Sequence, residues 1–173
     1  MYDKILVPVD GSPTSAAGLT EAIRLAQLTK GRLRLVHVVD ELSFAMSMDA
    51  YVGRANDWLE ELRGTGGKVL AAAQEKVSAA GVESDTVLCD SFKGSVQEIV
   101  TAEAASWPAD VIVIGTHGRR GVGRLVMGSS AEQVCRLATV PVLLIRSPEA
   151  PVPHEPSEKL VDLHVPSGSL AYE

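Results

Sequence analysis

Apolar and polar positions divide most of this 173-residue chain into two alternating kinds of segment. Short apolar runs rich in β-branched residues are typical of strands, and they lie at 4–9, 32–39, 83–89, 111–114 and 140–145. Between them, apolar residues recur at helical spacing, such as Leu19, Ala22, Ile23 and Ala26. The pattern predicts an α/β fold in which five parallel strands form a single open, twisted sheet with helices on both faces.

Polar residues mark where the predicted helices begin and end. Asp10-Gly11-Ser12-Pro13 follows the first strand, and Ser12 is expected to be the N-cap of a helix with proline in its first turn. Ser95 is expected to cap the helix that Trp107-Pro108 ends. A long helix is expected over about 54–80, and the glycines within 64–67 leave open whether it is continuous.

Composition restricts the class of protein. A hydrophobic content of 46% suits one globular domain with a substantial core. The 22 acidic and 16 basic residues give a formal net charge of −6, which argues against nucleic-acid binding by charge alone. No run approaches the roughly 20 apolar residues of a membrane span, so we expect a cytoplasmic protein without membrane association. Cys89 and Cys135 lack metal-ligand spacing and are expected to be reduced thiols, with Cys135 at an apolar helix position.

Candidate chemistry concentrates in the loop after the fourth strand. From Gly115 to Ser129 the chain has five glycines, three arginines and one histidine but no acidic residue. Glycines let backbone N–H groups approach a ligand closely, and Gly128-Ser129-Ser130 opens the next helix, whose macrodipole favours phosphate. The loop therefore predicts an anion site. A Walker P-loop is excluded, because Arg124 stands where lysine should be and Leu125 where Mg²⁺ needs a hydroxyl.

Two further candidates lie at the ends of the first and second strands. Asp10 is expected at the carboxyl edge of the sheet, where its carboxylate either accepts hydrogen bonds from ribose hydroxyls or forms an Asx turn. Val38 can offer its main-chain N–H and C=O groups to the edge of a base. His37 is interpreted as a packed strand histidine, because no second ligand accompanies it at metal spacing. Residues 41–53 are either a lid over the base or a loop packed on its own apolar residues.

The order and spacing of these segments resemble the universal stress protein family. The resemblance is carried by an opening KILVPVDGS, by LVHVVD in the second strand, by Gly115-x-x-Gly118 followed after nine residues by Gly128-Ser129, and by a closing VPVLLIR. It covers residues 1–147, and the glycine spacing is similar to that of the ATP-binding, UspA-like subclass. It implies a Rossmann-like fold similar to that of the adenine nucleotide alpha hydrolases, with strand order 3-2-1-4-5 and a switch point between strands one and four. Residues 148–173 are proline-rich and acidic and are expected to form a mobile tail.

The resemblance also implies a ligand and the residues that hold it. The expected ligand is ATP or another adenine nucleotide, with cyclic AMP as an alternative; Mg²⁺ or Mn²⁺ would accompany the phosphates, and no metal site is assigned to the protein alone. The adenine is expected near Pro8 and Val38 and the ribose on Asp10. The phosphates are expected on the loop and on the start of the next helix, at Gly115, Thr116, His117, Gly118, Arg119, Gly128, Ser129 and Ser130. Arg119 is the one arginine expected to contact phosphate directly.

Turnover and assembly complete the expectations. No catalytic residue is assigned, because hydrolysis needs a metal ligand or a general base, and the nearest base, His117, lies in a positive loop that disfavours its charged form. We therefore expect a stress-response regulator that binds ATP with little or no turnover, and at most a weak ATPase. The alternative is a nucleotide-free interaction protein. The strand from Val140 to Ile145 is expected at the sheet edge, and the resemblance implies a homodimer through it.

Overall fold

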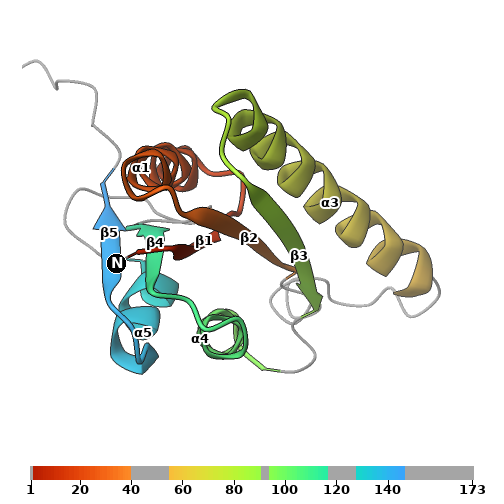
Figure 1. Ribbon diagram of the computed structural model, residues 1–173. Helices are drawn as coiled ribbons and strands as arrows, with labels where there is room; N and C mark the ends of the chain where they lie inside the picture. The colour runs from red at the N-terminus through yellow and green to blue at the C-terminus, as the bar shows by residue number, and fades with distance from the viewer. Residues whose placement is uncertain (1, 40–54, 91–93, 117–127, 147–173) are drawn as a thin grey trace, which may run out of the picture.

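Five parallel strands form one sheet in the order β3-β2-β1-β4-β5 (Figure 1). The strands are β1 (Lys4–Pro8), β2 (Arg32–Val39), β3 (Ser84–Asp90), β4 (Val111–Gly115) and β5 (Val142–Ile145). This computed structural model describes residues 2–39, 55–90, 94–116 and 128–146. The predicted fold class and strand order are confirmed, although β5 begins two residues later than the apolar run at 140–145 indicated.

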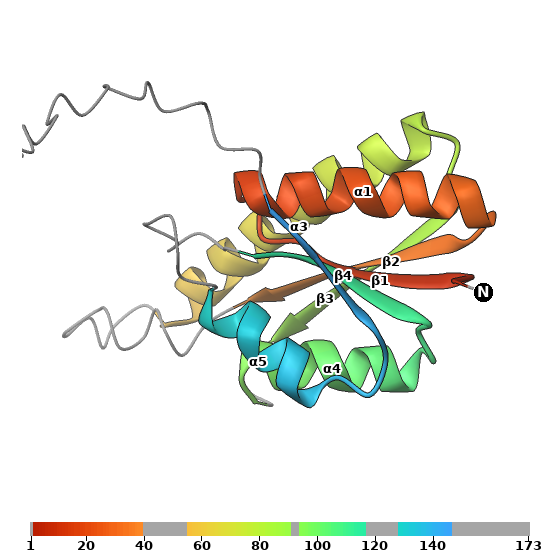
Figure 2. The same cartoon turned by 90° about the vertical axis from the view of Figure 1, so that its left-hand side faces the viewer.

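Two helices cover each face of the sheet, and each face has its own core (Figure 2). The helices are α1 (Pro13–Thr29) and α3 (Ala55–Ala79) on one face and α4 (Val96–Ser106) and α5 (Ser129–Leu137) on the other. Ile5 and Val7 of β1 enter the core under α1 and α3, whereas Leu6 enters the core over α4 and α5. Successive strand residues point to opposite faces, so a strand buried on both sides needs an apolar residue at every position.

Side-chain caps fix the starts of α1 and α4. The Ser12 hydroxyl accepts a hydrogen bond from the Ser15 N–H at 3.1 Å, and Pro13 is the first helical residue. At α4 the Ser95 N–H donates to the Glu98 carboxylate at 2.9 Å, as in a capping box. Hydrogen bonds from the Ser95 hydroxyl and N–H lower the pKa of Glu98. Both predicted N-caps are confirmed.

Helix α3 runs unbroken through its glycines, which answers the question that the sequence left open. Gly66 is buried, and a Cβ atom there would lie 2.6 Å from Cδ2 of His37 and 2.8 Å from Cδ1 of Leu88. Gly64 and Gly67 have no such neighbour within 4 Å. Gly66 is therefore the glycine that lets α3 lie directly on β2 and β3.

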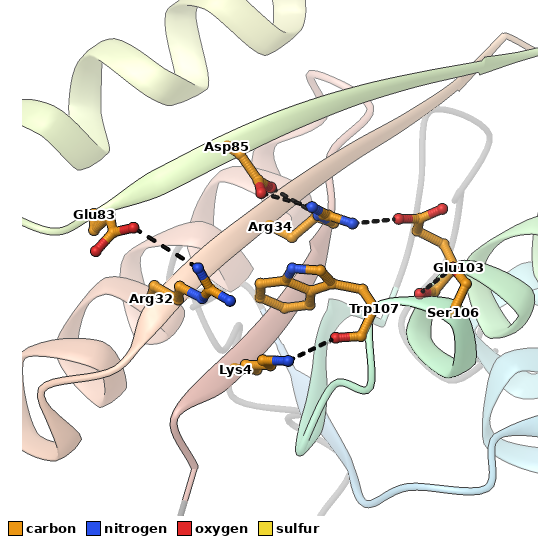
Figure 3. Close-up of polar contacts among 8 residues, drawn as sticks. All are labelled: Lys4, Arg32, Arg34, Glu83, Asp85, Glu103, Ser106 and Trp107. Carbon is orange, nitrogen blue, oxygen red and sulfur yellow. Dashed lines mark hydrogen bonds and ion pairs between the residues drawn. The ribbon is translucent and has the colours of Figure 1, made fainter.

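A charged cluster joins β2, β3 and α4 near the amino ends of the strands (Figure 3). The Arg34 guanidinium donates two hydrogen bonds to Asp85, both 2.7 Å long, and a third to Glu103 at 2.9 Å. The bonds to Asp85 are the main cause that raises the pKa of Arg34. The guanidinium also lies 4.7 Å from the ring centroid of the buried Trp107, and that of Arg32 lies 5.5 Å from it. The cations of this cluster are therefore committed to internal contacts.

Some expectations fall outside the described residues or change. The lid or loop at 41–53 and the tail at 148–173 are not among the described residues, so the division of the chain after residue 147 stays a prediction. Cys135 is exposed on α5, where the buried positions are Ala131 and Val134, so the expectation of an apolar helix position for its thiol is wrong. Within the described ranges, none of the helices is long and apolar enough to cross a membrane.

We expect Gly66→Ala to lower the free energy of unfolding, because the added methyl group must displace His37 and Leu88 or lift α3 from the sheet. Gly67→Ala is the matched control. It adds a methyl group to open space in the same helix and should raise stability by about 0.5–1 kcal/mol. Urea unfolding followed by circular dichroism measures both changes, and equal stabilisation by the two alanines would contradict the close contact at Gly66.

Candidate functional site

The carboxyl ends of β1 and β4 bring the two halves of the predicted site to one edge of the sheet. The strands are parallel neighbours, with Leu6 beside Ile112, so the chain leaves both at the same edge. The connection after β1 leads to α1 on one face, whereas the connection after β4 leads to α5 on the other (Figure 2). This divergence is a topological switch point, the place where open α/β sheets bind ligands.

Asp10 lies in a hydrogen-bonded turn directly beyond β1. Its carboxylate Oδ1 accepts from the Ser12 N–H at 2.9 Å, and its own N–H donates to the Ser15 hydroxyl at 3.2 Å. Gly11, between them, has a φ of +80°, a conformation that favours glycine. The Asx turn that the sequence offered as one interpretation is therefore present. It uses one carboxylate oxygen, and a carboxylate accepts several hydrogen bonds, so the turn is compatible with a contact to ribose.

A backbone hydrogen bond closes the glycine-rich loop. Thr116 is buried beyond the end of β4, where its N–H donates to the Ile145 carbonyl at 2.9 Å. Its own carbonyl accepts from the Gly128 N–H at 2.8 Å. The start of α5 is thereby fixed beside the end of β4. His117, Gly118 and Arg119 lie between these two points and outside the described residues.

Helix α5 begins without the side-chain cap that α1 and α4 have. Its N-cap is Gly128, which carries no side chain, and no side-chain hydrogen bond caps this end. Ser129 and Ser130 are its first residues, and Glu132 in the first turn pairs with Arg136 at 2.8 Å. An uncapped helix start has backbone N–H groups and the positive end of the macrodipole available for an anion.

Gly115 has a packing role that the sequence analysis missed. A Cβ atom on Gly115 would lie 2.6 Å from the carbonyl oxygen of Thr14, and one on Gly18 would lie 3.2 Å from the Gly115 nitrogen. The first turns of α1 therefore lie in backbone contact with β4 through this pair of glycines. Gly18 was the available signal, since a glycine inside a helix costs stability and usually has a packing reason.

Val38 and Pro8 lie where the sequence analysis expected them, at the carboxyl ends of β2 and β1. The Val36 carbonyl accepts from the Val9 N–H at 2.8 Å, so the Val36 backbone groups point toward β1. Because peptide groups alternate along a strand, those of Val38 point the same way, beyond Pro8, where β1 has ended. The side chain of Val38 is half-buried on the α4 and α5 face.

His37 is a packed strand histidine, in agreement with the interpretation of the sequence. Its ring is 6% exposed, and Nδ1 lies 2.7 Å from the Val9 carbonyl oxygen. Because a carbonyl can only accept, Nδ1 carries the proton in this bond. Among the described residues there is no group of three or more His, Cys, Asp or Glu side chains that could hold a metal ion.

A groove of about 600 Å³ lies at the opposite edge of the sheet, away from these residues. It is lined by both signs of charge, from Lys4, Lys30 and Arg32 on one side of the balance and Asp3 and Glu83 on the other. Arg32 and Glu83 lie 3.9 Å apart across it. None of the predicted site residues lines this groove, so it is separate from the switch point.

The strand order and the switch point define a doubly wound α/β protein. The model of the universal stress protein family matches residues 1–146, and the chain belongs to that family. Universal stress protein YxiE of Bacillus subtilis (strain 168) is 30% identical over 151 residues, which cover 84% of this chain and all of the relative. A crystal structure of a family member from Burkholderia pseudomallei is 32% identical, with a TM-score of 0.68 over 83% of this chain and 96% of that one.

Two more distant structures share the fold and hold ligands. One is a universal stress protein from Archaeoglobus fulgidus in complex with dAMP, 23% identical, with a TM-score of 0.60 over 83% of this chain and 98% of that one. The other is a universal stress protein in complex with cAMP, 20% identical, with a TM-score of 0.59 over 85% of this chain and 98% of that one.

We expect Gly115→Ala to destabilise the protein by about 1–3 kcal/mol, the usual cost of overpacking, because its methyl group meets the backbone of Thr14 and no side chain can move aside. Thermal and urea unfolding of the ligand-free protein measure the change, with Gly64→Ala as the control at a glycine that has open space. An unchanged stability for Gly115→Ala would mean that this glycine serves the ligand alone.

Proposed function

We propose that this chain binds an adenine nucleotide, ATP in the first place, as a stress-response regulator with little or no turnover. Family membership supports a role of this kind. The observation that carries the proposal is the hydrogen bond from the Gly128 N–H to the Thr116 carbonyl. It places the uncapped start of α5 beside the strand whose neighbour, β1, leads into the Asp10 turn. Anion-binding and ribose-binding groups therefore meet at one edge.

The ligand lies across this edge in the proposed arrangement. The adenine contacts Pro8 and the main chain of Val38, and the ribose hydroxyls donate to Asp10. The triphosphate lies against the loop and the start of α5. Its partners there are the backbone of Gly115, Thr116, His117, Gly118 and Arg119, the Arg119 guanidinium, and the N–H groups of Gly128, Ser129 and Ser130. The roles of residues 117–119 rest on the glycine spacing alone.

The related structures narrow the ligand class. The complexes with dAMP and with cAMP support an adenine nucleotide as the ligand class for this fold. A triphosphate fits this chain because the loop and the α5 start together offer donors over more than one phosphate. A cation such as Mg²⁺ or Mn²⁺ would be carried by the phosphates, since the described residues form no metal-ligand cluster of three or more side chains.

We expect Gly128→Val and Gly118→Val to lower ATP affinity at least about 100-fold. A valine side chain takes the space between backbone N–H groups and phosphate, and several charge-assisted hydrogen bonds of about 1.5–3 kcal/mol each are lost. Calorimetric titration of ATP measures the affinity, and circular dichroism verifies the fold. Folded glycine variants that bind ATP as tightly as the wild type would sink the proposed phosphate loop.

Asp10→Ala is the comparison within the same site. Its effect should be smaller, about 1–2 kcal/mol, because only the ribose contacts are lost and the phosphate contacts remain. Competition of ATP against cyclic AMP and dAMP ranks the ligands. If the wild type binds none of them, the alternative, an interaction protein without nucleotide, replaces this proposal.

We further propose a homodimer through the last strand. β5 is an edge strand, and its Leu143 and Leu144 are 41% and 36% exposed. The Pro141 and Ile145 carbonyls accept from β4 and from Thr116, so the alternating backbone groups of Val142 and Leu144 point away from the sheet. An apolar edge with outward N–H and C=O groups is suited to pairing with a second copy.

Replacement of both Leu143 and Leu144 with lysine should convert the dimer to a monomer, because charged side chains on an edge strand oppose strand pairing. Leu28→Lys is the control, since Leu28 is 83% exposed on α1 and away from β5. Light scattering at micromolar concentration gives the mass of each variant. A wild type that is monomeric with and without ATP would overturn the dimer.

A further inference from the structure

The hydrogen-bond ladder between β1 and β2 stops at an unusual point. Residue pairing runs from Lys4 beside Arg32 to Pro8 beside Val36, and the Val9 N–H then donates to the Val36 carbonyl at 2.8 Å. In a continuing parallel ladder the next bond runs from the Val38 N–H to the Val9 carbonyl. Here the donor at that carbonyl is the His37 ring, with Nδ1 2.7 Å from the oxygen. A side chain thus takes the place of a ladder bond.

The His37 ring is held in this position from the other side. It is 6% exposed, and the backbone of α3 at Gly66 lies so close that a Cβ atom there would be 2.6 Å from its Cδ2. Gly11, in the turn beyond β1, meets the same helix, since a Cβ atom on it would lie 3.4 Å from Val69. Helix α3 therefore packs on the ring and on the turn together, so the hydrogen bond to Val9 has little room to change.

We propose that His37 is a positioning residue: by occupying the Val9 carbonyl it ends the β1–β2 ladder and keeps the Val38 N–H available to the base of a bound nucleotide. The first half of this inference concerns the protein alone. The second half rests on the nucleotide-binding function proposed above, which places the base at Val38.

Base selection follows from this arrangement. A main-chain N–H beside a C=O matches the edge of adenine, which offers N1 as acceptor and the N6 amino group as donor. Guanine offers a donor at N1 and an acceptor at O6, so each partner meets its own kind. A site built to pair with one edge rejects a ligand that leaves its polar groups unpaired. If the Val38 N–H were used by Val9 instead, this discrimination would be lost.

The first test is amide hydrogen exchange in the nucleotide-free wild type, resolved by NMR. The Val36 amide, inside the ladder, should be protected, and the Val38 amide should exchange about tenfold faster or more. In His37→Leu, which keeps an apolar side chain of similar size but has no donor, the Val38 amide should become as protected as that of Val36. Equal protection of the two amides in the wild type would overturn the ladder role, whatever the protein binds.

The second test compares ATP and GTP by calorimetry in the wild type and three variants. His37→Leu should lower the ATP to GTP affinity ratio by about tenfold, the effect of one lost hydrogen bond and its mismatch. His37→Asn carries an amide N–H at the position of Nδ1 and should retain most of the ratio. His37→Gln places its amide one bond farther out and should behave like His37→Leu.

The outcomes separate the two proposals. If the wild type binds neither nucleotide, the proposed function fails while the exchange test still decides the ladder role. If the wild type binds ATP and GTP equally, or if His37→Leu weakens both alike and preserves their ratio, the base-positioning role is wrong. Loss of the ratio in Leu and Gln with recovery in Asn is the result that we expect.

Discussion

The pairing of β1 with β4 is the constraint on which the rest of this molecule depends. These neighbours are about a hundred residues apart in sequence, and their pairing sets the switch point between the two halves of the sheet. Asp110 fixes their amino ends, because its Oδ2 accepts from the N–H groups of Asp3 and Lys4, both at 2.8 Å. The bond from Lys4 is the main cause that lowers the pKa of Asp110. The Asp10 turn and the glycine loop then share the opposite edge.

Close backbone approach is the second constraint, and it joins stability to the site. Gly18 and Gly115 bring α1 onto β4, and Gly66 brings α3 onto β2. The same contacts place the Asp10 turn under α1 and the His37 ring under α3. A change at one of these glycines therefore acts on the fold and on the carboxyl edge at once, whereas the phosphate role proposed for Gly128 lies outside these contacts.

The two edges of the sheet have different characters. At the amino edge, the charges of Arg34, Asp85 and Glu103 satisfy one another around Trp107 (Figure 3). At the carboxyl edge, backbone groups dominate, and one helix begins at a glycine without a side-chain cap. Internal ion pairs stabilise tertiary contacts but have few groups to offer a ligand, while uncapped N–H groups are suited to an anion. This contrast supports the assignment of ligand binding to the carboxyl edge.

The sequence by itself determined the element types, their order, the caps at Ser12 and Ser95 and the family, because hydrophobic period, turn residues and motif spacing are local signals. Only the tertiary structure decided which glycines face another backbone, that α3 is continuous, that Cys135 is exposed, and that His37 bonds to Val9. These features depend on the distance between elements far apart in the chain. Propensity and period carry no information about that distance, so packing settles it.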